Sequence, residues 1–215
     1  MKKIRIVIAF VLMAVLMTGI TIVTNSQNLK NMFMSAISSD KKDESIVATV
    51  DGEKIYQYEI DAHLIFTQMQ RANLPDDEKD SVKEYTAQEI LENRIESIVL
   101  VNEAKRQGIK CDYKEAKNYI KDSYDMIMEA NDENTIFLKE YLINSELSEN
   151  EYLQLATESH YRALLKAKLM ENFYKENGND LKTEEYEKYK NELIRNADIK
   201  IKSSAFGLPQ VVSDN

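Results

Sequence analysis

Hydrophobic residues follow a helical period over most of the chain and alternate like a strand only near the two ends of its central part. The first apolar run, Ile6 to Val23, contains no charged residue and approaches the length of about 20 residues that a helix needs to cross a bilayer. Lys2, Lys3 and Arg5 precede this run, which predicts a cytoplasmic N-terminus and an extracytoplasmic remainder. Residues 1–25 are therefore predicted to be a membrane anchor, and a cleaved secretory signal is the alternative.

Residues 26–44 are predicted to form a juxtamembrane linker that contains a short amphipathic helix. The apolar residues of this helix recur at helical spacing and are Leu29, Met32, Phe33, Ala36 and Ile37. Such a helix would either lie on the outer face of the membrane or continue the anchor. The polar stretch SSDKKDES then separates it from the body of the chain.

The stretch VATVDGEKIYQYEI predicts a hairpin followed at once by a helix. Residues 46–50 are rich in β-branched side chains, and Asp51-Gly52 is a strong signal for a two-residue turn. A return strand would include Ile55, and the helix would begin at about residues 56–58. Glu59 occupies the acidic position of a capping box, but Tyr56 replaces the usual Ser or Thr, so we expect a missing cap to cost about 1 kcal/mol.

Five more helices are predicted from the 3.6-residue period and from the residues at helix ends. Gly108, the Asp112/Glu115 pair and the Ser148/Glu151 pair mark three of these ends. The predicted ranges are about 82–107, 112–130, 135–143, 148–176 and 183–196.

The stretch ADIKIKS alternates in the manner of a strand and places Ile199 and Ile201 on one face. An isolated strand or two-stranded ribbon is marginally stable, and the hairpin is the available partner. We therefore predict a mainly α-helical domain over residues 45–203, whose terminal strand joins the opening hairpin. Residues 204–215 are predicted to form a flexible tail.

The composition narrows the range of functions. The chain has 37 acidic and 28 basic residues and a net charge of −9, so nucleic acid is excluded as a predicted partner. Five glycines and two prolines in 215 residues are typical of a helical protein. Cys111 is the single cysteine, which excludes an internal disulfide and a multi-cysteine zinc site.

No residue pattern indicates catalysis, a cofactor or a metal. His63 and His160 each lack a second histidine at helical spacing, and His160 shares a stripe with apolar residues, so a core role is favoured over a metal ligand. The nucleophile motif G-x-S-x-G, a Gly-rich phosphate loop and the zinc motif HExxH are absent from the sequence. We accordingly predict a protein without catalytic residues, metal or cofactor.

Four stretches together resemble the N-terminal chaperone module of the SurA and PrsA family of extracytoplasmic folding factors. They are VATVDGEKIYQYEI, RIESIVLVNEAKRQGIK, SENEYLQLATESHYRALLKAKL and LIRNADIKI, and they span residues 46–202. The resemblance lies in the order and spacing of these stretches. It implies a helical domain that binds unfolded or newly secreted polypeptides without ATP.

The sequence departs from many relatives at the junction KENGNDLKT, between the long helix and the last one. Many family members carry a parvulin prolyl isomerase domain there, of about a hundred residues. The junction has no room for such a domain, so the family's isomerase activity is not carried over.

Aromatic and methionine side chains on three predicted helices are the candidate client-binding residues. These residues are Phe66, Met69, Tyr124, Met128, Phe137 and Tyr141. An open apolar crevice between the helices would favour a chaperone, since Met and Tyr tolerate varied partners. Burial in a closed core would favour the alternative, an adaptor for one envelope or secretion-complex protein, or a structural role.

Overall fold

The computed structural model describes residues 27–38, 43–72, 74–79, 83–177 and 183–202. Their helices and strands, in chain order, are α2 (Gln27–Ile37), β1 (Ile46–Val50), β2 (Glu53–Tyr56), α3 (Gln57–Ala72), α4 (Ala87–Arg106), α5 (Tyr113–Ala130), α6 (Glu133–Asn144), α7 (Glu149–Asn177), α8 (Thr183–Asn196) and β3 (Ile199–Ile201). The predicted mainly helical class with a small sheet is confirmed.

The predicted anchor and the predicted tail lie outside the described residues. Among the residues that are described, no helix combines the length and the apolar character needed to cross a membrane.

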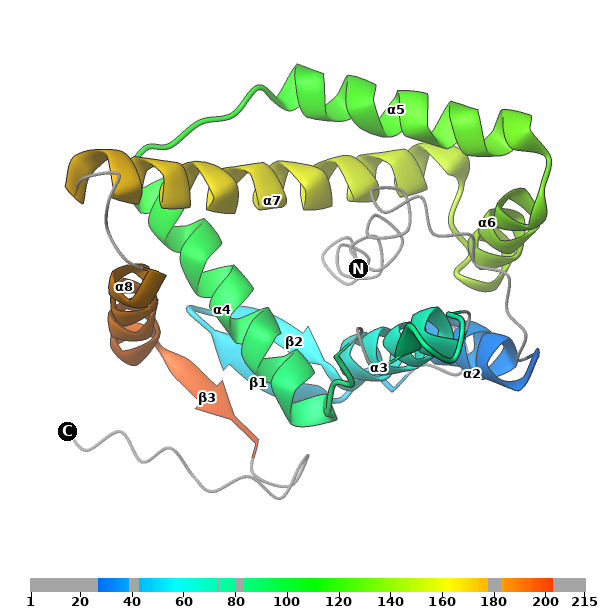
Figure 1. Ribbon diagram of the computed structural model, residues 1–215, viewed down its shortest axis with the longest axis horizontal. Helices are drawn as coiled ribbons and strands as arrows, with labels where there is room; N and C mark the ends of the chain where they lie inside the picture. The colour runs from blue at the N-terminus through cyan, green and yellow to red at the C-terminus, as the bar shows by residue number, and fades with distance from the viewer. Residues whose placement is uncertain (1–26, 39–42, 73, 80–82, 178–182, 203–215) are drawn as a thin grey trace.

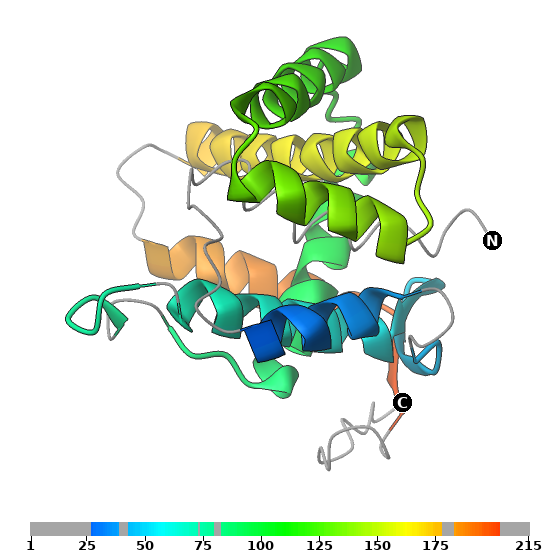
Figure 2. The same ribbon diagram turned by 90° about the vertical axis from the view of Figure 1, so that its right-hand side faces the viewer.

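The helices form two layers that α4 and α6 connect (Figure 1). The long helix α7 packs against α5 on one side of the molecule, while α2 packs against α3 on the opposite side. Helix α4 contacts α3, α7, α8 and β1. Figure 2 shows α6 between the two pairs, where it contacts both α2 and α5.

The sheet has the order β2-β1-β3, with both neighbouring pairs antiparallel. Thr49 in the central strand lies opposite Lys54 of β2 on one side and Lys200 of β3 on the other. Residues from the two ends of the described domain therefore meet in one sheet, as predicted.

The hairpin turn also holds the start of β3. Asp51 and Gly52 have φ angles of 49° and 80°, the left-handed pair that a two-residue turn of type I′ requires. The amide of Asp51 donates to the carbonyl of Asp198 at 2.9 Å, and the amide of Asp198 donates to the Asp51 carboxylate at 3.0 Å. The turn that closes the hairpin thus fixes where the terminal strand begins.

The start of α3 is capped by the backbone instead of by a side chain. The amide of Gln57 donates to the carbonyl of Ser45 at 2.9 Å, and the amide of Tyr58 donates to the carbonyl of Asp43 at 3.0 Å. These two bonds satisfy amides that have no partner within a helix. The predicted loss of stability from a missing cap is therefore wrong, because residues just before β1 take over that role.

Helix α4 begins at Ala87, later than the predicted residue 82. Thr86 is its N-cap, and Thr86 and Glu89 form a complete capping box. The sequence carries the Thr-x-x-Glu signal of this capping box at residues 86–89. The other helix ends follow the prediction closely: Gly108 has a φ of 71° just after α4, and Asp112 caps α5.

Three groups of buried side chains hold the elements together. The sheet core joins the strands to α3 and α4 and includes Val47, Val50, Ile55, Ile60, Ile90, Leu91 and Ile98. A second group joins α4 to α7 and consists of Leu100, Val101, Ala104, Leu165 and Leu169. The third and largest group, the helical core, lies between α2, α3, α5, α6 and α7.

Two neighbouring substitutions in β3 test whether the terminal strand contributes to the sheet core. Ile201 is half-buried and packs on that core, whereas the Lys200 side chain is 74% exposed. We expect Ile201→Ser to lower the free energy of unfolding by about 1–2 kcal/mol, because apolar burial is lost. Lys200→Ser should change it by less than about 0.5 kcal/mol. Urea unfolding measures both, and equal effects would contradict the packing of β3.

Candidate functional site

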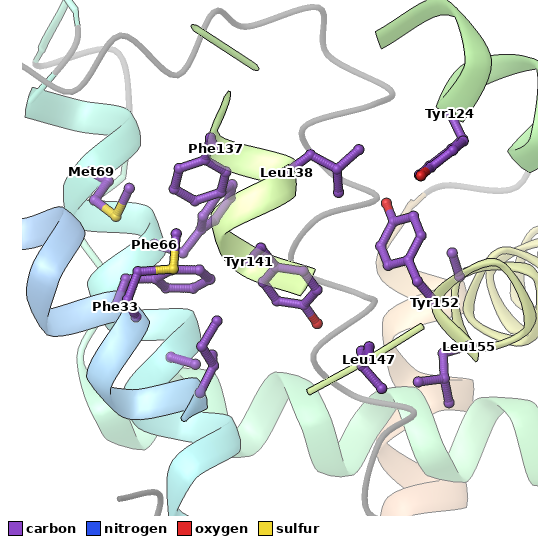
Figure 3. Packing of buried hydrophobic residues seen from close by; sticks show 14 of the residues in the cluster. Phe33, Phe66, Met69, Tyr124, Phe137, Leu138, Tyr141, Leu147, Tyr152 and Leu155 are labelled. Carbon is purple, nitrogen blue, oxygen red and sulfur yellow. The ribbon is translucent and has the colours of Figure 1, made fainter. Parts of the chain in front are cut away.

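All six candidate residues lie in the helical core. They come from three helices: Phe66 and Met69 from α3, Tyr124 and Met128 from α5, and Phe137 and Tyr141 from α6. Figure 3 shows Phe66, Met69 and Phe137 beside Phe33 of α2 at one end of the cluster, and Tyr124 beside Tyr152 of α7 at the other end. The helical spacing of apolar residues on three separate helices thus identified side chains that the fold brings into one cluster.

The cluster is closed in this conformation. Five of the six side chains are at most 4% exposed, and Met128 is half-buried against them: the buried five are Phe66, Met69, Tyr124, Phe137 and Tyr141. Of the two alternatives, an open crevice and a closed core, these residues form the closed core here. Such burial favours a structural or adaptor role for them as long as the cluster stays closed.

Helix α2 covers one side of the cluster. The ring of Phe33 is fully buried, and its centroid lies 6.1 Å from that of Phe66 and 5.7 Å from that of Phe137. The spacing of its apolar residues predicts the helix itself, but it does not predict that the helix packs against α3 and α6. Met32, assigned to the apolar stripe, is 45% exposed, and Met34 is buried in its place.

The tyrosines keep the cluster uncharged. The Tyr124 hydroxyl donates to the Glu149 carboxylate at 3.2 Å, and burial, with the nearby negative charge, raises the pKa of Tyr124 to about 12. Burial also raises the pKa of Tyr141 well above its usual value. Both phenols therefore stay protonated near neutral pH, and the surface that this cluster would offer to a ligand is apolar with hydroxyl groups.

A partly buried charged cluster lies beside the sheet, formed by Glu53, Glu59, Arg94 and Arg162. Arg94 Nη2 donates to Glu53 at 3.2 Å, and Arg94 Nε donates to Glu59 at 3.4 Å. Arg162 of α7 forms an ion pair with the same Glu53 at 3.0 Å. These contacts connect β2, α3, α4 and α7, so the cluster fixes the hairpin relative to three helices.

Sequence reasoning missed this cluster, although a signal was available. Arg94 lies three residues after Leu91 and four before Ile98, on the apolar side of α4. Arg162 lies seven residues after Leu155 and seven before Leu169, on the buried side of α7. An arginine on a core-facing stripe needs a buried acidic partner.

Glu59 has the most unusual environment of the four. It is 3% exposed, and this burial raises its pKa to about 7, although the Arg94 guanidinium acts in the opposite direction. A carboxyl group with such a pKa can act as a general acid or base at neutral pH. The Glu59 carboxyl group is enclosed and faces an arginine, which favours a structural role.

An open groove lies between the first half of α5 and the middle of α7. It has a volume of about 830 Å³, and its lining includes Tyr119, His160, Leu164 and the half-buried Cys111. The Tyr119 and His160 rings stack with centroids 4.7 Å apart. Burial raises the pKa of the Cys111 thiol, which makes it a poor nucleophile near neutral pH.

The two histidines do not come together. His63 lies on α3, and His160 lies on α7 in the groove, where partial burial lowers its pKa. Within the part of the chain that the structure describes, no three His, Cys, Asp or Glu residues are grouped so that they could hold a metal ion.

Comparison with known protein families assigns the chain to one of them. The model of the SurA-like N-terminal domain matches residues 1–166, which is more than three quarters of the sequence. The chain belongs to the SurA-like N-terminal domain family. The match ends within α7, so it does not include the closing strand β3. No curated protein and no solved structure matches the chain.

The SurA-like N-terminal domain is the chaperone-type, non-catalytic module of its family. No parvulin domain is detected, and only residues 178–182 separate α7 from α8. That separation is far too short for an inserted domain of about a hundred residues.

The pKa of Glu59 predicts a specific dependence of stability on pH. Its folded value of about 7 lies above the ordinary value of 4.5, so the native state binds this proton more tightly than the unfolded state does. The contribution of Glu59 is complete below about pH 4.5 and is lost as the pH rises through 7. Glu59→Gln should therefore flatten the decline in unfolding free energy between about pH 5 and pH 8, by on the order of 1–3 kcal/mol.

Urea unfolding at both pH values measures this change. The control is Glu129→Gln, which removes an exposed carboxylate on α5 instead of a buried one. It should leave the decline in unfolding free energy unchanged. Parallel pH profiles for wild type and Glu59→Gln would show that Glu59 stays ionised in the native state.

Proposed function

We propose that the protein is an extracytoplasmic chaperone that holds unfolded or newly translocated polypeptides without using ATP. Its membership of the SurA-like family supports this proposal most directly. The helical core would supply the binding surface, because its aromatic and methionine side chains can contact apolar segments of many sequences.

The proposed location follows from the sequence that precedes α2. The uncharged run Ile6 to Val23 would anchor the chain, and the basic residues before it would keep the N-terminus in the cytoplasm. The folded domain would then face the extracytoplasmic side, close to the membrane, where translocated chains emerge. A secreted form would result if the run were cleaved as a signal.

The acidic surface should give the protein a preference for basic client segments. With a net charge of −9, the protein attracts basic segments and repels anionic ones. The same charge keeps a complex with an unfolded chain soluble. Binding should be weak and reversible, because a disordered client loses conformational entropy when it is captured.

A second function, an adaptor for one envelope or secretion-complex protein, is favoured by one observation. The candidate residues are packed in a closed core, so the protein in this conformation does not offer them to arbitrary clients. An adaptor would instead use its outer surface, for example the groove along α5 and α7.

Suppression of aggregation separates the two functions. The full chain in lipid nanodiscs is mixed with three unrelated unfolded proteins, one of them basic and one acidic, and light scattering is followed without ATP. We expect suppression of all three at an equimolar or small molar excess, with the strongest effect on the basic protein. Empty nanodiscs are the control. No suppression, together with one tight partner in pull-downs, would support the adaptor instead.

Isomerisation kinetics test the proposed lack of catalysis. The cis-to-trans rate of a proline-containing model peptide should be the same with and without the protein, because the segment between α7 and α8 is too short for a parvulin domain. A parvulin at the same concentration provides the positive control. Acceleration that saturates with peptide concentration would show that the protein is an enzyme.

A further inference from the structure

Helix α2 packs on an apolar surface made by α3 and α6, which we call the seat of α2. The ring of Phe33 contacts both Phe66 of α3 and Phe137 of α6, with ring centroids 6.1 and 5.7 Å away (Figure 3). Met34 and Ile37 are also buried in the helical core. If α2 were removed, Phe66 and Phe137 would lose the ring that covers them, and an apolar surface would open between α3 and α6.

Two of the three groups of buried side chains contain no residue of α2. The sheet core consists of residues from the strands, α3, α4 and the α8–β3 end of the chain, and the second group joins α4 to α7. The four members of the charged cluster lie on β2, α3, α4 and α7. Loss of α2 would therefore open the helical core on one side while these other groups of contacts stay in place.

The seat of α2 is incomplete. A hollow of about 360 Å³ remains along its polar edge against α6, lined by Lys30, Ser35, Glu140 and Asn144 among others. The helix has 11 residues, no acidic residue in its first turn and no basic residue in its last. An isolated helix shorter than about 12 residues is marginal in water, so α2 owes its structure to its seat.

The residues of α2 that contact the seat indicate which kind of ligand could bind there. Apolar side chains at Leu29, Phe33 and Ile37 recur every fourth residue along one face. Lys30 lies beside this face and forms an ion pair with Glu140 of α6 at 2.6 Å. The seat therefore fits a short amphipathic helix that has an aromatic residue at its centre and a basic residue one turn before it.

We propose that α2 occupies the client-binding surface of this chaperone as an internal substitute for a client. Clients are segments able to form an amphipathic helix, with apolar residues every fourth position and a basic residue near the start, and they bind between α3 and α6 by displacing α2. This proposal rests on the proposed chaperone function and names its substrate class. It also accounts for the burial of Phe66 and Phe137, since both lie under α2 until a client replaces it.

Competition between α2 and a client determines how tightly the client binds. A tethered segment acts at an effective concentration in the millimolar range for short linkers, so a free peptide must outcompete it. The apparent affinity falls in proportion to the fraction of molecules in which the surface is open. A substitution that weakens the seating of α2 should therefore increase binding in trans.

Peptide binding to two full-length variants tests this competition. The probe is a fluorescent peptide with the sequence QNLKNMFMSAIS, residues 27–38 of the chain itself. Phe33→Ser removes the buried ring of α2, and Met32→Ser changes the neighbouring side chain, which is 45% exposed. In nanodiscs, we expect the peptide to bind Phe33→Ser at least about tenfold more tightly than wild type or Met32→Ser.

A second peptide, with Ser in place of the central Phe, should bind none of the three chains. Equal binding of the first peptide to wild type, Met32→Ser and Phe33→Ser would overturn the proposal, and so would its failure to bind a folded Phe33→Ser chain. Circular dichroism shows whether the variants keep the native helix content.

If Phe33→Ser does not fold, Lys30→Glu provides the same readout from the edge of the seat. It replaces the ion pair with Glu140 by two opposing carboxylates and leaves Phe33 in place. We expect the peptide to bind this variant about threefold more tightly than wild type. Binding equal to that of wild type would overturn the proposal.

The aggregation assay, run on the same variants, separates this proposal from the chaperone function itself. Peptide binding that increases in Phe33→Ser without any suppression of aggregation would support the seat of α2 and contradict the chaperone. Suppression that is equal in wild type and Phe33→Ser, without peptide binding, would support the chaperone and place its client surface elsewhere.

Discussion

Strand β1 requires a partner on each side, and the chain provides these partners from positions far apart in the sequence. β2 follows it directly through the Asp51-Gly52 turn, whereas β3 arrives only after all the helices from α3 to α8. A two-stranded ribbon is marginal by itself. The helices between β2 and β3 must therefore fold back on themselves so that Ile199–Ile201 can reach β1. This return gives the domain its shape.

The return of the chain to β1 also divides the buried interior into a region around the sheet and a region between the helices, which have different roles. Around the sheet, the apolar core and the charged cluster of Glu53, Glu59, Arg94 and Arg162 fix four elements relative to one another. Away from the sheet, the helical core depends on a short helix that comes before β1 in the chain. The arrangement combines a fixed frame with an apolar surface that one segment covers. Such a combination suits a protein that binds unfolded chains reversibly.

Local signals were sufficient to predict most of the fold. Asp51-Gly52, Gly108 and Asp112 mark their turn or helix ends through properties of the residues themselves, and the alternation around Ile199 needed a partner that the hairpin alone could provide. Long-range contacts were less accessible. Arg94 and Arg162 meet Glu53 across distant parts of the sequence, and the backbone cap of α3 comes from residues before β1. For the candidate residues, periodicity identified side chains that face the interior, but it could not show that α2 covers them.

If α2 covers a client-binding surface, it must open separately from the frame around the sheet. Native-state hydrogen exchange of the full chain in nanodiscs measures this most directly, because each amide reports the free energy of the opening that exposes it. We predict that amides of β1, the central strand, exchange only through global unfolding, while amides of α2 exchange through a local opening of clearly lower free energy. Equal protection of α2 and β1 would contradict the account, because α2 would then be an inseparable part of the domain.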